Sequence, residues 1–366
     1  MKLAIIGSRG FLTHYGGYET FVKKLALSLS EKDVFVIVYG MANYRNSDND
    51  KYFPAVKRIW ISTLHVRFLE KVLSSLLAVL HVCFSDTDII LSISVSSGLL
   101  LFLPCLLGKQ VVVNPDGLEW KRPKWSKFIN FFLRLSEWMA VNFSNIVVAD
   151  SQVIKEYIVN KYKKRTIFIP YGAEINGYSD NDAEVLAKYK LRPKQYYLQV
   201  CRLEPENNSH LIIKEFVDYK GGKKLIIVGD TPHSIEYKKN LEKEGNHKVR
   251  FLGSVYGADH KVILRNAYCY IHGHEAGGTN PSLLEAMASA RCPVVLNVPY
   301  NLEVVGDCGL SFSKNRGDLA EKLSFLDSNE NLVKSLGDRA LVRVKKHYTW
   351  EKVISDYDIV FRSLVR

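Results

Sequence analysis

Paired cysteines, long charge-free segments and repeated sequence are scarce in this chain of 366 residues. Its six cysteines are scattered and none stands in a C-x-x-C pair, which argues against a disulfide scaffold and against a zinc site with the usual ligand spacing. Several lie in apolar runs, where a reduced cysteine behaves as a small hydrophobic residue. We therefore expect reduced thiols, a cytosolic protein and no structural metal.

One segment is long and apolar enough to be considered as a membrane span. Ile89–Leu107 comprises 19 residues without a charged side chain, which meets the length of a spanning helix. It also contains four serines, Gly98 and Pro104, and it begins with β-branched residues. We predict instead a buried strand, a short helix and then a strand at Gln110–Asn114. The apolar run near the first residue has only four residues before Gly7, too few for the core of a signal peptide.

Positive charge is concentrated in the first half of the chain. Residues 1–172 hold 22 lysines and arginines against 13 aspartates and glutamates, whereas the whole chain has a net charge of +12. This asymmetry predicts an anionic partner for the first half, either a membrane surface, a lipid diphosphate or a nucleic acid. Trp120–Trp138 interleaves aromatic and basic residues. Because no nucleic-acid module is recognisable, the interleaving favours a membrane interface.

His65–Phe84 has the periodicity of an amphipathic helix. Its apolar stripe runs from residue 68 to residue 80 and includes Leu77 and Leu80. We expect this stripe to pack against the core, with a helix lying on the inner leaflet of a membrane as the alternative.

Strands and helices alternate along the chain from its first residues. Strand Lys2–Gly7, loop Ser8–Gly17, helix Tyr18–Ser30 and strand Asp33–Tyr39 form a βαβ opening. The loop has G-x-x-G in place of the dinucleotide fingerprint, which disfavours a nicotinamide-dependent oxidoreductase. The Gly-Gly pair that ends the loop suits a phosphate at a helix start, although a simple tight turn remains an alternative.

The segment from His272 to Met287 carries the strongest functional signal. It follows a short strand-like run, opens with a glycine pair, and continues into a helix of strong helix formers. Polar side chains at the helix start, together with the helix dipole, predict an anion site there. Glu285 stands about one turn into the helix, where a carboxylate suits two sugar hydroxyls better than a phosphate.

Two further candidates follow predicted strands. Asp116 comes directly after strand Val111–Val113, and parallel α/β sheets keep their chemistry at such carboxyl ends. A turn role for Asp116, between Pro115 and Gly117, remains the alternative. Arg202 follows strand Tyr196–Val200, where a surface ion pair is its alternative role.

Four strings in the chain, RGFLTHYGGYET, NPDGLEWKR, RLEPENN and HGHEAGGTNPSLLEAM, resemble one family over essentially its whole length. The resemblance is to retaining GT-B glycosyltransferases of family 4, in the rhamnosyltransferase-like branch of bacterial surface polysaccharide (O-antigen or capsule) biosynthesis. It implies an α/β fold with two Rossmann-like domains facing a cleft. Residues 1–172 are then an acceptor-binding domain, residues 173–345 a nucleotide-sugar-binding domain, and residues 346–366 a helix returning to the first domain.

The resemblance also implies roles for single residues. Asp116 is the first choice for a residue at the reaction centre and Glu119 the second. The expected donor-binding residues are Gly16, Gly17, Arg202, Asn207, Gly278, Thr279, Asn280, Ser282 and Glu285.

Two positions depart from the family pattern. The family has a sugar-facing Glu eight residues before the Glu that matches Glu285. In this chain Gly277 stands at that position, and Glu275 is two residues out of register. Asn207 replaces a diphosphate-binding Lys, so diphosphate neutralisation is expected to depend more on Arg202 and on helix N-termini.

The implied reaction is transfer of a hexose with retention, without a metal or another cofactor. The donor is expected to be dTDP-L-rhamnose and the acceptor a polyprenyl-diphosphate-linked saccharide. The enzyme would then be cytoplasmic and peripheral on the inner face of the cytoplasmic membrane. The alternatives are another hexose from a UDP- or GDP-sugar, a GT-B epimerase or phosphorylase, and a non-catalytic scaffold that binds lipid diphosphate.

Overall fold

The computed structural model divides the chain into two compact units. Unit 1 comprises Met1–Tyr171 and Trp350–Arg366, and unit 2 comprises Gly172–Thr349. The structure describes residues 1–10, 17–45, 55–63, 69–121, 125–175, 182–231, 234–245 and 247–365. Each unit is an α/β structure built on one parallel sheet, so each is described by itself.

Unit 1 contains a seven-stranded sheet in the order β3-β2-β1-β4-β5-β6-β7, and every pairing is parallel. Consecutive residues of the central strands are buried, so both faces of the sheet are covered. This is expected for a parallel sheet flanked by helices. The strands are β1 (Lys2–Ile6), β2 (Phe35–Met41), β3 (Val56–Ile61), β4 (Ile89–Ile93), β5 (Gln110–Asn114), β6 (Ile146–Ala149) and β7 (Thr166–Phe168).

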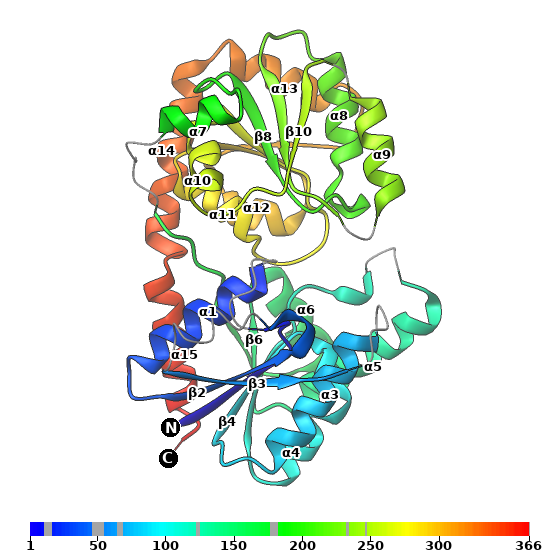
Figure 1. Ribbon diagram of the computed structural model, residues 1–366, viewed down its shortest axis with the longest axis vertical. Helices are drawn as coiled ribbons and strands as arrows, with labels where there is room; N and C mark the ends of the chain where they lie inside the picture. Colours follow the sequence, from blue (N-terminus) through cyan, green and yellow to red (C-terminus); the bar gives the residue numbers. More distant parts are fainter. Residues whose placement is uncertain are drawn as a thin grey trace. The chain divides into compact units, whose positions relative to one another are not determined.

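Helices flank this sheet, and Figure 1 shows α1 and α15 side by side in unit 1. Phe21 of α1 and Tyr357 of α15 are both buried, with ring centroids 5.3 Å apart. The α-helices of unit 1 are α1 (Gly17–Ser30), α3 (Leu69–Cys83), α4 (Phe102–Leu106), α5 (Lys127–Phe143), α6 (Gln152–Tyr162) and α15 (Trp350–Arg362), with the 3-10 helices η1 (Ala42–Tyr44), η2 (Val95–Leu100) and η3 (Glu119–Lys121).

Unit 2 contains a six-stranded parallel sheet in the order β10-β9-β8-β11-β12-β13. Its strands are β8 (Tyr196–Val200), β9 (Lys224–Val228), β10 (Val249–Gly253), β11 (Cys269–His272), β12 (Cys292–Leu296) and β13 (Leu310–Phe312). Its helices are α7 (Asp182–Lys188), η4 (Pro205–Asn207), α8 (Ser209–Asp218), α9 (Ile235–Glu244), α10 (Gly257–Asn266), α11 (Pro281–Ala288), α12 (Pro299–Val305), α13 (Asp318–Asp327) and α14 (Glu330–His347).

In each sheet, one glycine directly follows a strand that is not at the edge of the sheet. Gly7, after β1, has a φ of +90°, and Gly229, after β9, has a φ of +137°. A Cβ atom on Gly7 would lie 2.1 Å from the carbonyl oxygen of Ile93, and one on Gly229 would lie 1.8 Å from that of Cys201. Only glycine allows the backbone to pass this close to the neighbouring strand end.

The segment considered as a membrane span has the predicted strand–helix–strand structure. Ile89–Ile93 forms β4, Phe102–Leu106 forms α4, and Gln110–Asn114 forms β5. Among the described residues, no helix is both long enough and apolar enough to cross a bilayer.

The predicted packing face of the helix in residues 65–84 is wrong in part. Helix α3 begins its described part at Leu69, and its buried face carries small residues, including Ser74, Ser75 and Ala78. Ser75 shares a hydrogen bond of 2.9 Å with Ser96 of η2. Because the small residues let the neighbouring backbone approach closely, Leu77 and Leu80 turn outward and are 43% and 41% exposed.

Candidate functional site

The predicted donor-binding residues of unit 2 lie at the carboxyl edge of its sheet. Strands β8 and β11 are neighbours there, although β9 and β10 come between them in the sequence. The strand order therefore reverses between these two strands, and ligands of open α/β sheets bind at such a point. The loop after β8 carries Arg202 and Asn207, and the loop after β11 carries the glycine pair and the start of α11.

Arg202 is exposed, whereas Asn207 is buried and shapes the loop between them. The side-chain amide of Asn207 donates a hydrogen bond of 2.7 Å to the carbonyl oxygen of Arg202. The next residue, Asn208, has a left-handed φ of +53° and donates a hydrogen bond of 2.9 Å to the carbonyl oxygen of Gly273. These contacts fix the Arg202 loop against the end of β11, and nothing in the local sequence marks Asn208 for this role.

The start of α11 is capped by Asn280, which was predicted as a donor-binding residue. Its side-chain oxygen accepts hydrogen bonds from the backbone N–H of Ser282, at 3.0 Å, and from the Ser282 hydroxyl, at 2.8 Å. Pro281 has no N–H to offer a ligand. The helix start therefore presents fewer backbone donors to an anion than the sequence predicted.

A hydroxyl pair joins this helix start to the end of β8. Tyr270 donates a hydrogen bond of 2.8 Å to the Ser282 hydroxyl, and the two hydroxyls lie 3.2 Å and 3.3 Å from the carbonyl oxygen of Val200. Thr279 is buried beside them, and Gly277, with a φ of +133°, makes the turn before Gly278. The structure thus brings the predicted Arg202 loop and glycine loop together.

Glu285 is partly exposed on α11 and pairs with a residue that the sequence did not single out. One of its carboxylate oxygens lies 3.1 Å from Nε2 of His260 on α10. The side chain of Glu285 is 39% exposed, and that of His260 is 17% exposed. The histidine therefore orients the carboxylate that was predicted to bind sugar hydroxyls.

Glu275 forms polar contacts of its own on the β11 loop. Lys314 donates to its carboxylate at 2.7 Å and Asn208 at 3.2 Å. Burial opposes ionisation of this carboxyl, but these two hydrogen bonds outweigh burial and hold its pKa below the ordinary value. Glu275 is therefore an ionised, anchored side chain.

Two stacked histidines lie at the carboxyl end of β11. The rings of His272 and His274 are 4.3 Å apart and nearly parallel. His272 is fully buried, and burial lowers the pKa of its imidazole to about 3. This histidine is therefore neutral at physiological pH.

In unit 1, Asp116 lies at the carboxyl end of β5, as predicted. It has a left-handed φ of +60°, and its backbone N–H donates a hydrogen bond of 3.0 Å to the side-chain oxygen of Asn114. Asn114 is buried and donates in turn to the hydroxyl of Tyr357 on α15, at 3.0 Å. Glu119 accepts a hydrogen bond of 3.3 Å from the indole of Trp125.

A lysine that the sequence did not mark as a site residue lies among these carboxylates. The ammonium group of Lys71 on α3 is 3.4 Å from the Ser94 hydroxyl, after β4. Burial and then the Arg9 guanidinium lower the pKa of Lys71. The carboxylates of Glu119 and Asp116 act in the opposite direction, so all these groups are close enough to interact.

Buried Glu19 of α1 belongs to the same cluster. It is 2% exposed and lies 3.9 Å from the Arg9 guanidinium. Burial raises the pKa of its carboxyl, and Arg9 and Lys71 partly counteract this rise. Gly17 is the first residue of α1, whereas the prediction for Gly16 falls outside the described residues. The loops after β1, β4 and β5 therefore hold one polar cluster at the strand-order reversal of unit 1.

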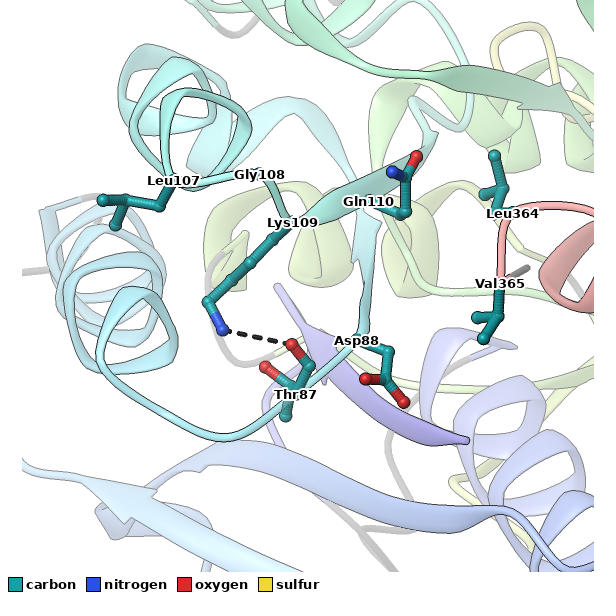
Figure 2. Close-up of a pocket in the computed structure, with 8 residues that line it drawn as sticks. All are labelled: Thr87, Asp88, Leu107, Gly108, Lys109, Gln110, Leu364 and Val365. Atoms are coloured by element: carbon teal, nitrogen blue, oxygen red, sulfur yellow. Dashed lines mark hydrogen bonds between the residues drawn. The ribbon is translucent and has the colours of Figure 1, made fainter.

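A separate pocket lies at the opposite, amino-terminal edge of the unit 1 sheet. It has a volume of about 370 Å³ and is lined by residues 87–88, 107–110 and 364–365. Figure 2 shows Lys109 directed toward the backbone of Thr87, to which it donates a hydrogen bond of 3.1 Å. Lys109 is therefore held by a hydrogen bond to the backbone of its own unit. The pocket lies at the other end of the strands from the polar cluster.

Within the described part of the chain, no three His, Cys, Asp or Glu side chains gather as a metal site would require. All six cysteines are free thiols.

Two parallel α/β units of this kind define the GT-B fold, and comparison with solved structures supports this class. Sucrose-phosphate synthase from Thermosynechococcus elongatus superposes with a TM-score of 0.81, at 15% identity over 100% of this chain and 99% of that chain. Anabaena Alr3699/HepE, solved in complex with UDP-glucose, gives a TM-score of 0.80 at 15% identity over 99% of this chain and 100% of that chain. The predicted GT-B fold is confirmed.

Sequence comparison relates the chain to one family within this class. Residues 180–343 match the family model "Glycosyl transferases group 1", and residues 102–174 match a domain of unknown function, DUF1972. An uncharacterized glycosyltransferase, MJ1069, of Methanocaldococcus jannaschii is 28% identical over 232 residues. That match covers 61% of this chain and 59% of the relative. The chain is therefore related to the group 1 glycosyltransferases through unit 2, which contains the Arg202 and glycine loops.

Proposed function

We propose that this protein is a glycosyltransferase that moves rhamnose from dTDP-L-rhamnose to a polyprenyl-diphosphate-linked saccharide. Transfer proceeds with retention at the anomeric carbon, without a metal, in the assembly of a bacterial surface polysaccharide. The enzyme works in the cytoplasm, peripherally at the inner face of the cytoplasmic membrane, where such an acceptor is anchored.

The observation that carries the proposal is the joined pair of loops in unit 2. The loop that carries exposed Arg202 and the glycine loop before α11 lie at the strand-order reversal. The hydroxyls of Tyr270 and Ser282 join the start of α11 to the end of β8, from which the Arg202 loop begins. An arginine beside a glycine-rich helix start suits a diphosphate. Glu285 follows within the same helix and suits the hydroxyls of a ribose. The segment with these features is the one that matches the group 1 model.

The chemistry follows from these groups. The bond between the anomeric carbon and the diphosphate oxygen breaks, and a bond forms between that carbon and the acceptor hydroxyl oxygen. The acceptor proton passes to the departing phosphate oxygen, so the products are the glycosylated acceptor and a nucleoside diphosphate. Arg202 stabilises the charge that develops on the leaving group. Asp116 of unit 1 acts at the reacting sugar.

The choice of rhamnose depends on the resemblance of the four sequence strings to the rhamnosyltransferase-like branch. A second candidate is transfer of another hexose from a UDP-sugar, because a protein of the same fold was solved with UDP-glucose bound.

Release of nucleoside diphosphate by the purified protein tests the proposal. We expect release from dTDP-L-rhamnose, and only when a short polyprenyl-diphosphate saccharide is present. UDP-glucose, a GDP-sugar and dTDP-glucose serve as competing donors. Glu285→Ala is expected to weaken nucleotide binding about tenfold, since it removes a carboxylate that accepts sugar hydroxyls.

Acceptor-dependent release from another donor would retain the class and overturn the rhamnose assignment. Release that needs no acceptor would favour an epimerase or hydrolase. If no donor reacted and Glu285→Ala bound nucleotide as the wild type does, the scaffold alternative would replace the transferase.

Replacement of Arg202 by alanine is expected to weaken binding of dTDP about 30-fold, because a charge-assisted hydrogen bond to the diphosphate is lost. Titration calorimetry measures the effect, and Arg202→Lys should recover part of it. Arg192→Ala removes another exposed arginine, which lies before β8 at the other end of the strand, and this variant should bind as the wild type does. Equal affinities for all variants would remove Arg202 from the site.

A further inference from the structure

Helix α5 of unit 1 presents an aromatic face to solvent. Phe128, Phe131 and Trp138 are 72%, 63% and 48% exposed. Phe132 contacts both other phenylalanines edge-on, with ring centroids 4.8 Å and 5.7 Å apart. The opposite side of the helix is buried through residues such as Leu133, Ala140 and Val141. Soluble proteins seldom expose neighbouring large aromatic side chains without a partner for them.

The adjacent helices also expose apolar side chains. Figure 1 shows α3, α4 and α5 next to one another in unit 1. Leu77 and Leu80 on α3 are exposed, as is Leu106 at the end of α4, which is 78% exposed. The rings of Trp138 and Phe143 of α5 meet edge to face, with centroids 6.2 Å apart. The ring centroid of Phe143 lies 5.9 Å from that of Phe102 of α4. The aromatic face of α5 thus continues toward α4.

Basic side chains border the aromatic face. Lys127 is exposed at the start of α5. Arg134 lies over the ring of Trp120 at 4.4 Å, with Lys121 and Lys161 at 5.7 Å and 5.6 Å from the same ring. The one acidic residue of α5, Glu137, is buried and accepts hydrogen bonds from Trp120, Tyr157 and Lys161. The exposed charges of this helix are therefore all positive.

We propose that the aromatic face of α5, formed by Phe128, Phe131, Phe132 and Trp138, docks unit 1 on an anionic lipid bilayer. Phenylalanine side chains enter the boundary between headgroups and acyl chains, and lysine and arginine remain at the anionic headgroups. This inference deepens the proposed function, because it names the surface that brings the enzyme to a lipid-linked acceptor.

Charge complementarity decides between a membrane and a second copy of the chain. A two-fold dimer through this face would place the same patch against itself, so Lys127 and Arg134 would meet like charges. An anionic bilayer meets the same positive rim with opposite charge. The lipid surface is therefore the occupant that the charges favour.

Co-sedimentation of the full-length protein with vesicles tests the proposal. We expect binding to vesicles of phosphatidylcholine and phosphatidylglycerol, and weaker binding to phosphatidylcholine alone. The double variant Phe128→Ser/Phe131→Ser should lower the partition coefficient about 100-fold, at about tenfold for each ring. Lys127→Gln should lower it about fivefold, and only on the anionic vesicles.

The matched control is Phe325→Ser, which removes a phenylalanine that is 50% exposed on α13 of unit 2 and should bind vesicles as the wild type does. Wild-type protein that fails to bind anionic vesicles, or a double variant that still binds them, would overturn the proposal. The proposal would also be overturned if the wild-type protein formed a dimer that the double variant could not form. Nucleoside diphosphate release is measured on the same preparations, so loss of the membrane surface and loss of the transferase are distinguished.

Discussion

Replacement of Asp116 by asparagine is expected to slow glycosyl transfer about 1000-fold, because a carboxylate at the reaction centre would lose its charge. Nucleotide affinity should stay unchanged, since the groups proposed to bind the nucleotide are in unit 2. Asparagine is the informative substitution here. Asp116 has a φ of +60°, and asparagine adopts this left-handed conformation as readily as aspartate does. The rate therefore reports on the carboxylate and not on backbone strain.

The chain offers a matched control for this variant. Asp33 is an exposed aspartate of unit 1 with a φ of +59°, so Asp33→Asn makes the same chemical change in the same conformation. Steady-state rates and thermal unfolding are measured for both variants. If Asp116→Asn kept more than about a tenth of the wild-type rate, Asp116 would be a turn residue, and Glu119→Gln would be tested next.

Substitution of Gly229 by alanine is expected to lower the free energy of unfolding of unit 2 by about 4 kcal/mol. The added Cβ atom would lie 1.8 Å from the Cys201 carbonyl oxygen, at a φ of +137° that alanine avoids. The backbone strain and the steric clash each contribute a few kcal/mol. For a unit of this size the melting temperature should fall by about 10 °C.

Gly222→Ala is the control, because a Cβ atom there meets no heavy atom within 4 Å and the expected change is below about 0.5 kcal/mol. Denaturant unfolding of both variants gives the free energies directly. Because Cys201 precedes Arg202, the Gly229 variant should also bind dTDP more weakly. Equal stability of the two variants would mean that the strand ends move apart at little cost.

The strands and their order of appearance were largely predictable from the sequence. The predicted ranges at Tyr196–Val200 and Gln110–Asn114 agree with β8 and β5. Continuous runs of β-branched and apolar residues mark strands that are buried on both faces. The short strand β13 (Leu310–Phe312) was missed, because three residues are too few to show any periodicity.

Several predicted site residues, such as Asp116 and Arg202, lie in loops that follow a strand, and position in the sequence is enough to predict where they lie in the fold. Their partners are not adjacent in sequence. His260 reaches Glu285 from the neighbouring helix, and Lys71 reaches Ser94 from α3. Nothing in the local sequence marks either residue, because what brings them to the site is the packing of helices on a sheet.

The packing of α3 was predicted wrongly for a related reason. Hydrophobic periodicity identifies an apolar stripe but not the partner it packs against. The partner, η2, approaches closely enough to require small side chains, so serine and alanine face inward, and Leu77 and Leu80 remain exposed. The same limit applies to Asn280, whose chemistry suits a ligand but whose side chain caps its own helix.

The division of the chain between units has a consequence for synthesis on the ribosome. Unit 2 is one continuous stretch of sequence, whereas unit 1 is completed by α15, which follows unit 2 in the chain. Tyr357 of α15 holds Asn114, and Asn114 holds the backbone of Asp116. A nascent chain can therefore finish folding unit 2 while unit 1 still lacks a helix. The support beneath Asp116 forms only when α15 emerges, so chains truncated before α15 should retain the Arg202 and glycine loops of unit 2 and lack this support for the Asp116 backbone.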